Sequence, residues 1–331
     1  MNLPTVRVTA PSRLHFGMLS FGNDGVPQYG GVGIMVDVPV LQLRISPSWG
    51  RAWEFCGPLA ERIELFASRW IRTNGLKAVP ACRIEVQQLP PPHTGLGTGT
   101  QLALSVAAGL HKVFGLDTTT PCQMARSVGR AARSAVGTFG FFHGGFIFES
   151  GKTSPDGDAV LEQQLPICDA WRVVLIRPVA GIGISGQTEN DTFSQLPPVP
   201  ADVTTLLRSE VVSRMSPAVA SGDFGVFSES VYAYGRIAGN CFASAQGGTY
   251  AAPELSRIVT MLRGWGIRGV GQSSWGPTLF ALVSSQEAAN QMVQQLQAEV
   301  EDGAYELVIS RPNNSGATFL VTPGAGEKPN G

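Results

Sequence analysis

A glycine-rich loop joined directly to a small-residue helix constrains the fold of this chain most. The loop lies between Pro90 and Gln101, and the apolar stretch Leu102 to Leu110 follows it at once. Glycine lets the backbone approach a ligand closely, and the first turn of a helix presents unpaired N–H groups and a positive dipole end to an anion. We therefore expect a phosphate group at a strand–loop–helix junction. The expected phosphate-binding residues are Gly95, Gly97, Thr98, Gly99 and Thr100.

Apolar periodicity on either side of this loop predicts an α+β chain with two domains. Residues 1–168 are expected to form an N-terminal α/β domain that carries the loop, residues 169–323 a C-terminal domain, and residues 324–331 a disordered tail. Thr120-Pro121 predicts a helix start, and the helix is expected to continue to about Val136. Two late strands, 307–310 and 317–321, are expected to complete a small antiparallel sheet in the second domain.

Composition excludes several classes of partner. The net charge is −1 and there is no basic run, which argues against nucleic acid or an anionic membrane as the ligand. No stretch approaches the roughly 20 apolar residues that span a bilayer, so we expect a cytoplasmic protein that acts on small molecules. Only four of the 24 basic residues are lysines. The arginine excess fits either anion recognition or ordinary surface charge, and we favour surface charge.

Three further segments carry side chains suited to chemistry. A second glycine-rich loop, Gly269 to Pro277, contains Ser273 and Ser274. Two such loops suggest one shared site, although a turn without a ligand explains either loop alone. The segment Pro11 to Gly17 places Arg13 and His15 on one face of a strand, directed either into a cleft or toward surface and core. The block 136–146 combines glycine with aromatic residues, which form either a pocket wall or simple core.

These blocks, in this order, resemble the GHMP kinase superfamily over nearly the whole chain. The resemblance is closest to one branch, the beta-ribofuranosylaminobenzene 5'-phosphate synthases. The most specific segments are Pro11 to Gly17, His143 to Ile147, Ser185 to Glu189 and Gln272 to Thr278. The resemblance implies a two-domain GHMP-kinase-like fold, in which the N-terminal domain is α/β and the C-terminal domain is ferredoxin-like.

The resemblance also implies a reaction. A synthase of this branch joins 4-aminobenzoate, or a similar 4-substituted benzoate, to phosphoribosyl pyrophosphate and releases CO2 and pyrophosphate, in tetrahydromethanopterin biosynthesis. It implies Mg²⁺, no organic cofactor, and a homodimer as the assembly to consider. The catalytic residues it implies are Arg13, His15, His143 and Glu189. The substrate-binding residues are Ser12, Ser273 and Ser274, and the metal ligand is Asp37 or Glu189.

Two alternatives stay open at this stage. One is an ATP-dependent small-molecule kinase, whose loop would hold a nucleoside triphosphate. Superfamily kinases usually have paired serines where this chain has Thr98-Gly99-Thr100, and many carry an aspartate where residues 134–140 contain no acid. The missing acid removes an expected activator of the acceptor hydroxyl and favours the synthase. The other alternative is a non-catalytic relative that binds a phosphorylated metabolite.

Overall fold

The computed structural model describes most of the chain. The described residues are 3–23, 26–48, 50, 52–77, 79–117, 119–179, 193 and 195–324. Glu189 and residues 325–331 of the expected tail lie outside them. Within the described residues, no helix combines the length and the apolar character needed to cross a membrane.

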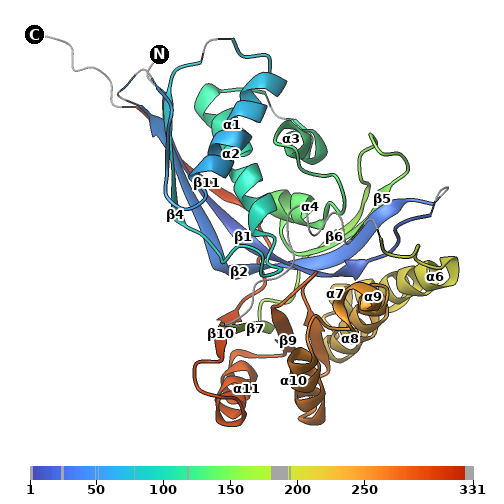
Figure 1. Cartoon of the computed structure of the whole chain (residues 1–331). Coiled ribbons are helices and arrows are strands. Elements are labelled where there is room, and N and C mark those ends of the chain that lie inside the picture. The colour runs from blue at the N-terminus through green and yellow to red at the C-terminus, as the bar shows by residue number, and fades with distance from the viewer. Residues whose placement is uncertain are drawn as a thin grey trace, which may run out of the picture.

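The first domain is built on a seven-stranded sheet (Figure 1). Its strand order is β11-β1-β2-β4-β3, with β5 pairing with the far half of β2 and β6 pairing with β5. Its strands are β1 (Thr5–Met18), β2 (Gln28–Pro47), β3 (Glu54–Cys56), β4 (Cys82–Gln88), β5 (Phe146–Lys152), β6 (Leu161–Leu165) and β11 (Thr318–Thr322). Alternating residues of β1 and β2, such as Val6, Val8 and Leu43, are fully buried, which is the pattern expected for strands with one face on a core.

Four helices cover one face of this sheet (Figure 1). They are α1 (Ala60–Thr73), α2 (Thr98–Phe114), α3 (Pro121–Ser127) and α4 (Val136–His143). The helix α2 is buried almost throughout because its side chains are small and apolar on every face. The glycine-rich loop that precedes α2 lies against β1, where the Arg13 N–H donates to the Leu96 carbonyl.

The second domain contains a four-stranded antiparallel sheet in the order β10-β7-β9-β8. Its elements are β7 (Arg172–Pro178), α10 (Pro253–Gly264), β8 (Gly269–Gln272), β9 (Leu279–Val283), α11 (Gln286–Glu299) and β10 (Tyr305–Ser310). This order, together with helices between β7 and β8 and between β9 and β10, is the ferredoxin-like arrangement. The expected α+β fold with a ferredoxin-like second domain is therefore confirmed.

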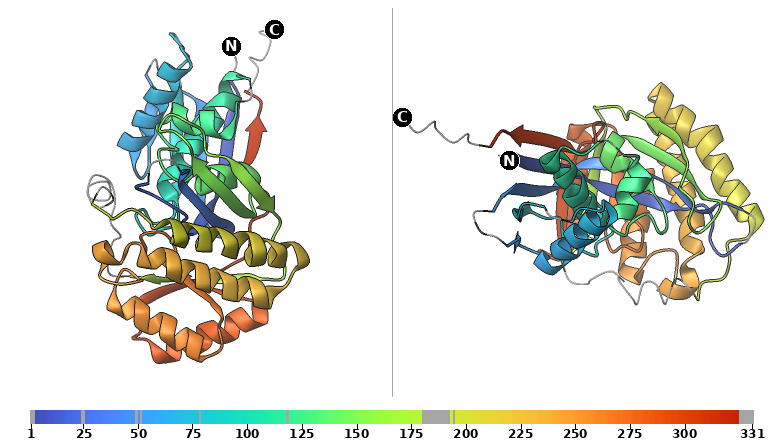
Figure 2. Two further views of the ribbon diagram at one scale, coloured as in Figure 1. Left: turned by 90° about the vertical axis from the view of Figure 1, so that its right-hand side faces the viewer. Right: turned by 90° about the horizontal axis from the view of Figure 1, so that it is seen from above.

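A helical layer connects the two sheets (Figure 2). It consists of α6 (Ala201–Glu210), the π-helical segment η1 (Val211–Met215), α7 (Ser216–Ser221), α8 (Phe224–Asn240) and α9 (Ala243–Gln246). The helix α8 contacts both β1 and β8. Phe227, Val231 and Tyr234 of α8 are fully buried in a core shared with Phe146 of the first sheet and Phe280 of the second. One continuous apolar core thus joins the two domains.

Two expectations about secondary structure are wrong. The strand expected at 317–321 forms as β11, but it pairs with β1 in the first sheet, so the C-terminal segment returns to the N-terminal domain. The helix expected to reach about Val136 ends at Ser127. Gly129 adopts a φ of 72°, and the Arg130 N–H donates to the Ala125 carbonyl. This is the Schellman arrangement that stops a helix at a glycine.

Candidate active site

The glycine-rich loop presents the start of α2 without a side-chain cap. The N-cap residue is Gly97, which has a φ of 74°. Because glycine has no side chain, it provides no cap to the N–H groups of the first turn. The Thr94 and Thr98 hydroxyls both donate to the Pro91 carbonyl, at 2.8 and 3.2 Å, and these bonds fix the shape of the loop. The N–H groups at this helix N-terminus therefore receive no side-chain cap from the N-cap residue, which is the arrangement that anion-binding helix starts have.

The second glycine-rich loop is seated directly on the first. The buried Ser273 hydroxyl donates to the Gly95 carbonyl at 2.7 Å and accepts the His15 N–H at 3.0 Å. The Ser274 N–H donates to the His15 carbonyl at 3.0 Å. The Thr278 N–H donates to the Thr94 carbonyl at 3.4 Å. The two loops, which are far apart in sequence, therefore meet at one place, and the side chain of Ser273 joins them.

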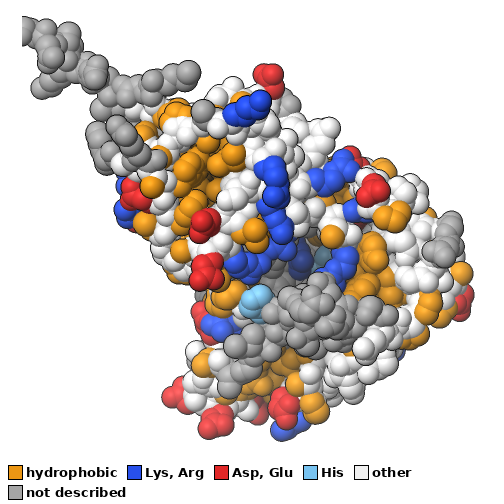
Figure 3. Space-filling model, turned by 45° about the horizontal axis from the view of Figure 1, so that its top comes forward, with side chains coloured by type: hydrophobic (Ala, Val, Ile, Leu, Met, Phe, Trp, Pro, Cys, Tyr) orange, Lys and Arg blue, Asp and Glu red, His pale blue; other side chains and the backbone are white. Residues whose placement is uncertain are grey.

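A cleft of about 590 Å³ opens over this junction. Its described walls are formed by β1, the two glycine-rich loops, α1 and the loop between α3 and α4. Basic side chains gather around the hollow (Figure 3). No acidic side chain is among the described residues that line it. The predicted site residues in its wall are Arg13, His15, Gly95, Gly97, Thr98, Gly99, Thr100 and Ser274.

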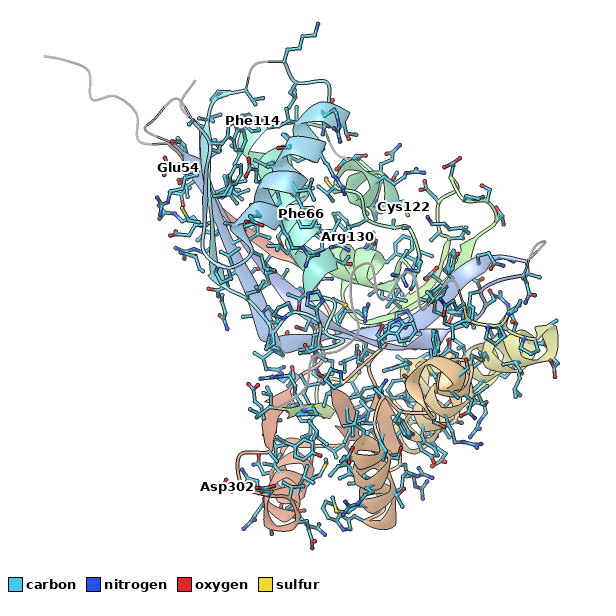
Figure 4. The ribbon with its side chains drawn as sticks, viewed as in Figure 1. Glu54, Phe66, Phe114, Cys122, Arg130 and Asp302 are labelled. Atoms are coloured by element: carbon cyan, nitrogen blue, oxygen red, sulfur yellow. The ribbon has the colours of Figure 1, made fainter. Side chains whose placement is uncertain are left out.

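Four arginines give the cleft its charge: Arg13, Arg62, Arg130 and Arg133. A Cβ atom placed on Gly99 would lie 2.9 Å from Nη2 of Arg130 and 3.2 Å from Nη2 of Arg62, so both guanidinium groups reach the first turn of α2. The Arg130 guanidinium lies over the ring of Phe66 at 5.4 Å from its centroid (Figure 4). The Arg62 guanidinium lies over the same ring at 5.9 Å. Partial burial lowers the pKa of Arg62. Several cations beside a helix N-terminus favour a ligand with more than one negative charge.

Arg13 is held against the phosphate loop. Its backbone N–H donates to the Leu96 carbonyl at 3.0 Å, and its Nη1 donates to the Gly95 carbonyl at 3.2 Å. A Cβ atom on Gly97 would lie 3.1 Å from Cβ of Arg13. Glycine at 97 therefore allows the β1 arginine to lie directly beside the helix start.

His15 is a neutral imidazole in a buried hydrogen-bonded chain. Its Nδ1 accepts the Gly17 N–H at 3.1 Å, so Nε2 carries the proton and donates to the Ser134 hydroxyl at 2.8 Å. That hydroxyl in turn donates to Oε1 of Glu149 at 2.9 Å. Burial, and then the nearby positive charge of Arg13, hold the pKa of His15 well below its usual value. The uncharged His15 ring thus holds Gly17 and Ser134 in place through hydrogen bonds.

Glu149 and Lys152 of β5 hold the loop that carries Arg130 and Arg133. Glu149 is fully buried, and its carboxyl accepts the Ala135 N–H at 3.0 Å in addition to the Ser134 hydroxyl. The Lys152 ammonium donates to the Ala131 carbonyl. The arginine loop is therefore anchored from the sheet on both sides of Arg133.

The buried carboxyl of Glu149 predicts a pH dependence of stability. Burial raises the pKa of Glu149 from 4.5 to about 7, against the lowering effect of its three hydrogen bonds. Because the folded state binds this proton more tightly than the unfolded state, its contribution is complete below about pH 4.5 and is lost as the pH rises through 7. The shift corresponds to roughly 3 kcal/mol.

Urea unfolding of wild type and Glu149→Gln at pH 5 and pH 8 checks this expectation. The amide does not ionise, so the variant should gain about 2 to 3 kcal/mol of unfolding free energy relative to wild type between the two pH values. A difference that is the same at both pH values would show that Glu149 does not titrate in this range.

Four predicted site residues lie outside the cleft walls, and they are Ser12, Asp37, His143 and Ser273, whose hydroxyl bonds to Gly95 and His15 between the two loops. Ser12 alternates with Arg13 along β1, so it faces the other way and its hydroxyl donates to the Pro39 carbonyl at 2.6 Å. Asp37 accepts from Asn313 at 2.8 Å, in the region where the chain returns to the first sheet. His143 is exposed at the C-terminal end of α4, whose aromatics Phe139 and Phe141 are core residues. Glu189 lies outside the described residues.

The described residues contain no group of three or more His, Cys, Asp or Glu side chains able to hold a metal ion. Together with the absence of carboxylates from the described cleft walls, this means that these residues do not fit a Mg²⁺ ion held mainly by the protein. The positive charge of the described cleft walls comes from the arginines.

Sequence reasoning missed Arg62, Arg130 and Arg133. The excess of arginine over lysine was a signal, but surface charge was the favoured explanation. The expected helix through Val136 would have placed Arg130 and Arg133 on a helix surface. The Gly129 stop turns them into the cleft instead.

Comparison with known proteins is consistent with this geometry. The family described as GHMP kinases N terminal domain matches residues 61–145, and GHMP kinases C terminal matches residues 215–302. A beta-ribofuranosylphenol 5'-phosphate synthase of Methanothermobacter thermautotrophicus is 28% identical, over 95% of this chain and 98% of that protein. A protein of the same name from Archaeoglobus fulgidus is 27% identical, over 96% of this chain and 100% of that one. The crystal structure of homoserine kinase from Cytophaga hutchinsonii has a TM-score of 0.69 at 18% identity, covering 96% of this chain and 97% of that one.

Proposed function

Because the chain belongs to the GHMP kinase superfamily, with the phosphate loop in place, we propose that it is a phosphoribosyl-transferring synthase of the beta-ribofuranosylphenol 5'-phosphate type. The reaction joins a 4-substituted benzoate to phosphoribosyl pyrophosphate and releases CO2 and pyrophosphate, in tetrahydromethanopterin biosynthesis. The relatives are named for a ribofuranosylphenol product, which 4-hydroxybenzoate rather than 4-aminobenzoate would give as the acceptor.

The observation that carries the proposal is the convergence of Arg13, Arg62 and Arg130 on the uncapped start of α2, in a cleft that Arg133 also lines and whose described walls hold no acid. Phosphoribosyl pyrophosphate brings a diphosphate and a separate 5'-phosphate, so it needs many cationic and N–H donors. A kinase transferring to a hydroxyl gains from a carboxylate base near the acceptor, and none lines the described cleft. The charge pattern therefore supports departure of pyrophosphate.

The chemistry requires no organic cofactor. The ring carbon that bears the carboxylate attacks C1 of the ribose, and the bond from C1 to the pyrophosphate oxygen breaks with its electron pair. The carboxylate then leaves as CO2, and its bonding electrons restore the aromatic ring. Arg13, Arg62 and Arg130 stabilise the charge on the leaving pyrophosphate, and the fixed N–H groups at the start of α2 do the same without reorganising.

We also propose Mg²⁺ as the metal. When bound, Mg²⁺ would neutralise part of the diphosphate, with ligand phosphates supplying its oxygens. We further propose that the protein acts on free small molecules in the cytoplasm, without nucleic acid or membrane as a partner, and that it forms a homodimer.

A label-release assay tests the function. Carboxyl-labelled 4-hydroxybenzoate should release labelled CO2 only when phosphoribosyl pyrophosphate is present. Unsubstituted labelled benzoate is the matched control, since it lacks the para donor that makes the attacking carbon electron-rich, and it should release none. If wild type forms no labelled CO2 with both substrates present, the proposal is wrong.

A thermal-shift comparison separates the synthase from a kinase. A ligand that binds the native state raises the unfolding temperature, so phosphoribosyl pyrophosphate should stabilise the protein and ATP should not at the same concentration. Stabilisation by ATP alone, with an ATP-dependent phosphorylated product, would favour the kinase. Stabilisation without turnover would favour a non-catalytic relative.

A further inference from the structure

A second pocket lies beside the arginine-lined cleft and shares part of its wall. His15, Met18, Ser274 and Trp275 line both spaces. The remainder of the pocket is formed by the C-terminal half of α8, by the segment that follows it, and by Gln272 at the end of β8. A molecule in this pocket would therefore be in direct reach of a molecule in the cleft.

The walls of the pocket suit a flat aromatic ring. Its lining includes Phe242 and Trp275, with ring centroids 4.9 Å apart and planes at 73° to each other. The helix α8 contributes Gly235, Ala238 and Gly239 to the same lining. Small residues allow a ring to approach the helix backbone, and aromatic walls provide edge and face contacts.

The pocket differs from the cleft in charge. No Lys, Arg, Asp or Glu is among the described residues that line it. Its titratable groups are neutral at pH 7, since burial lowers the pKa of His15 and raises the pKa of Tyr250 to about 12. A carboxylate inside such a pocket would lose its hydration without gaining a cation, whereas beyond the shared wall lies the cleft that Arg13, Arg62, Arg130 and Arg133 line. An aromatic acid is therefore oriented with its carboxyl end toward the cleft.

One wall residue of the pocket, Gln246, can read a ring substituent opposite the carboxylate. Gln246 lines the pocket, and its amide nitrogen donates to the carbonyls of Gly239 at 3.4 Å and Thr249 at 2.9 Å. Since both partners are acceptors, the orientation of the amide is fixed, and its oxygen is left to accept a hydrogen bond. A hydroxyl or amino group on the ring is a donor that matches this oxygen.

We propose that this pocket, between α8 and the Phe242–Trp275 pair, is the binding site of the 4-substituted benzoate acceptor. The proposal rests on the proposed function, since that function requires an aromatic acid next to the phosphoribosyl donor. The ring occupies the pocket, the carboxyl-bearing carbon lies at the shared wall toward ribose C1, and the para donor lies toward Gln246.

Substitution of Gly235 tests this site without disturbing the fold. A Cβ atom on Gly235 would meet only the Phe16 carbonyl oxygen, at 3.7 Å, so the first atom of a side chain fits. Alanine and leucine also favour the helix more than glycine does. Gly235→Leu fills the pocket and should raise KM for 4-hydroxybenzoate at least tenfold, and Gly235→Ala should raise it less. KM for phosphoribosyl pyrophosphate should stay within about twofold of wild type.

The matched control is Gly264→Leu, at the exposed end of α10, where a Cβ atom meets nothing within 4 Å. It should leave both KM values unchanged, and thermal unfolding should show that both leucine variants are folded. If Gly235→Leu leaves KM for 4-hydroxybenzoate unchanged, or raises both KM values equally, the acceptor does not bind in this pocket. The proposed function would still hold in that case, because wild type would remain active. Failure of the proposed function is distinguishable, because wild type itself would then release no labelled CO2.

Discussion

Replacing Arg13 with alanine is expected to lower kcat/KM for phosphoribosyl pyrophosphate by about tenfold to a hundredfold, since a charge-assisted hydrogen bond contributes about 1.5 to 3 kcal/mol and each 1.4 kcal/mol is about a factor of ten. Arg13 lies against the Gly95 carbonyl and beside Gly97, next to the start of α2. In the alanine variant, the phosphates of phosphoribosyl pyrophosphate would lose the Arg13 guanidinium as a partner. Steady-state kinetics with the donor varied at saturating 4-hydroxybenzoate measures the effect.

Arg13→Lys should recover only part of this loss, because an ammonium keeps the charge but not the planar fork of the guanidinium. The matched control is Arg208→Ala. Arg208 pairs with Glu162 at 2.7 Å on the surface, and such exposed pairs contribute little. We expect wild-type kinetics from this control. If Arg13→Ala also has wild-type kinetics, Arg13 does not bind the donor.

Gly95→Ala is expected to abolish most of the activity and to lower the unfolding free energy by about 2 to 4 kcal/mol, through left-handed strain and overpacking. Gly95 has a φ of 87°, and a Cβ atom there would lie 2.2 Å from the Ser273 carbonyl oxygen. Since that oxygen belongs to the backbone, the two glycine-rich loops would have to separate. The Ser273 bond to the Gly95 carbonyl would then be lost.

Gly75→Ala separates strain from packing. Gly75 also has a left-handed φ, of 65°, but a Cβ atom there meets nothing within 4 Å. This control should cost about 1 kcal/mol of stability and leave turnover unchanged. Label release and urea unfolding of both variants provide the measurement. If Gly95→Ala is as active as Gly75→Ala, contact between the loops is not needed for the site.

Much of the site could be predicted because it depends on local backbone chemistry. Glycines at 95, 97 and 99 followed by small apolar residues specify a loop and a helix start, whatever surrounds them. The pairing of Arg13 with His15 on one strand face follows from the two-residue repeat of a strand, and the same repeat directs Ser12 away. The resemblance to a superfamily then supplied the two-domain arrangement.

Other parts could not be predicted because they depend on long-range contacts. Arg62 and Arg130 are 68 positions apart in sequence numbering, yet both reach the first turn of α2 only because α1 and the α3–α4 loop pack beside it. Ser273 was expected to bind substrate, and its hydroxyl is instead used between Gly95 and His15. The Glu149 carboxyl accepts from Ser134 and Ala135, which precede it by a whole helix and a turn, and no local pattern around Glu149 indicates these contacts.

The amino-acid sequence by itself determined the glycine-rich loop at a helix start and the α+β character of the chain, because local periodicity and glycine placement act within a few residues, and the family resemblance added the ferredoxin-like arrangement of the second domain. Only the tertiary structure decided which charges surround the ligand, where the last strand pairs, and that an uncharged aromatic pocket adjoins the cleft. The physical reason is that charge convergence and pocket shape arise from packing between distant segments, and a buried core joining both sheets fixes those segments in place.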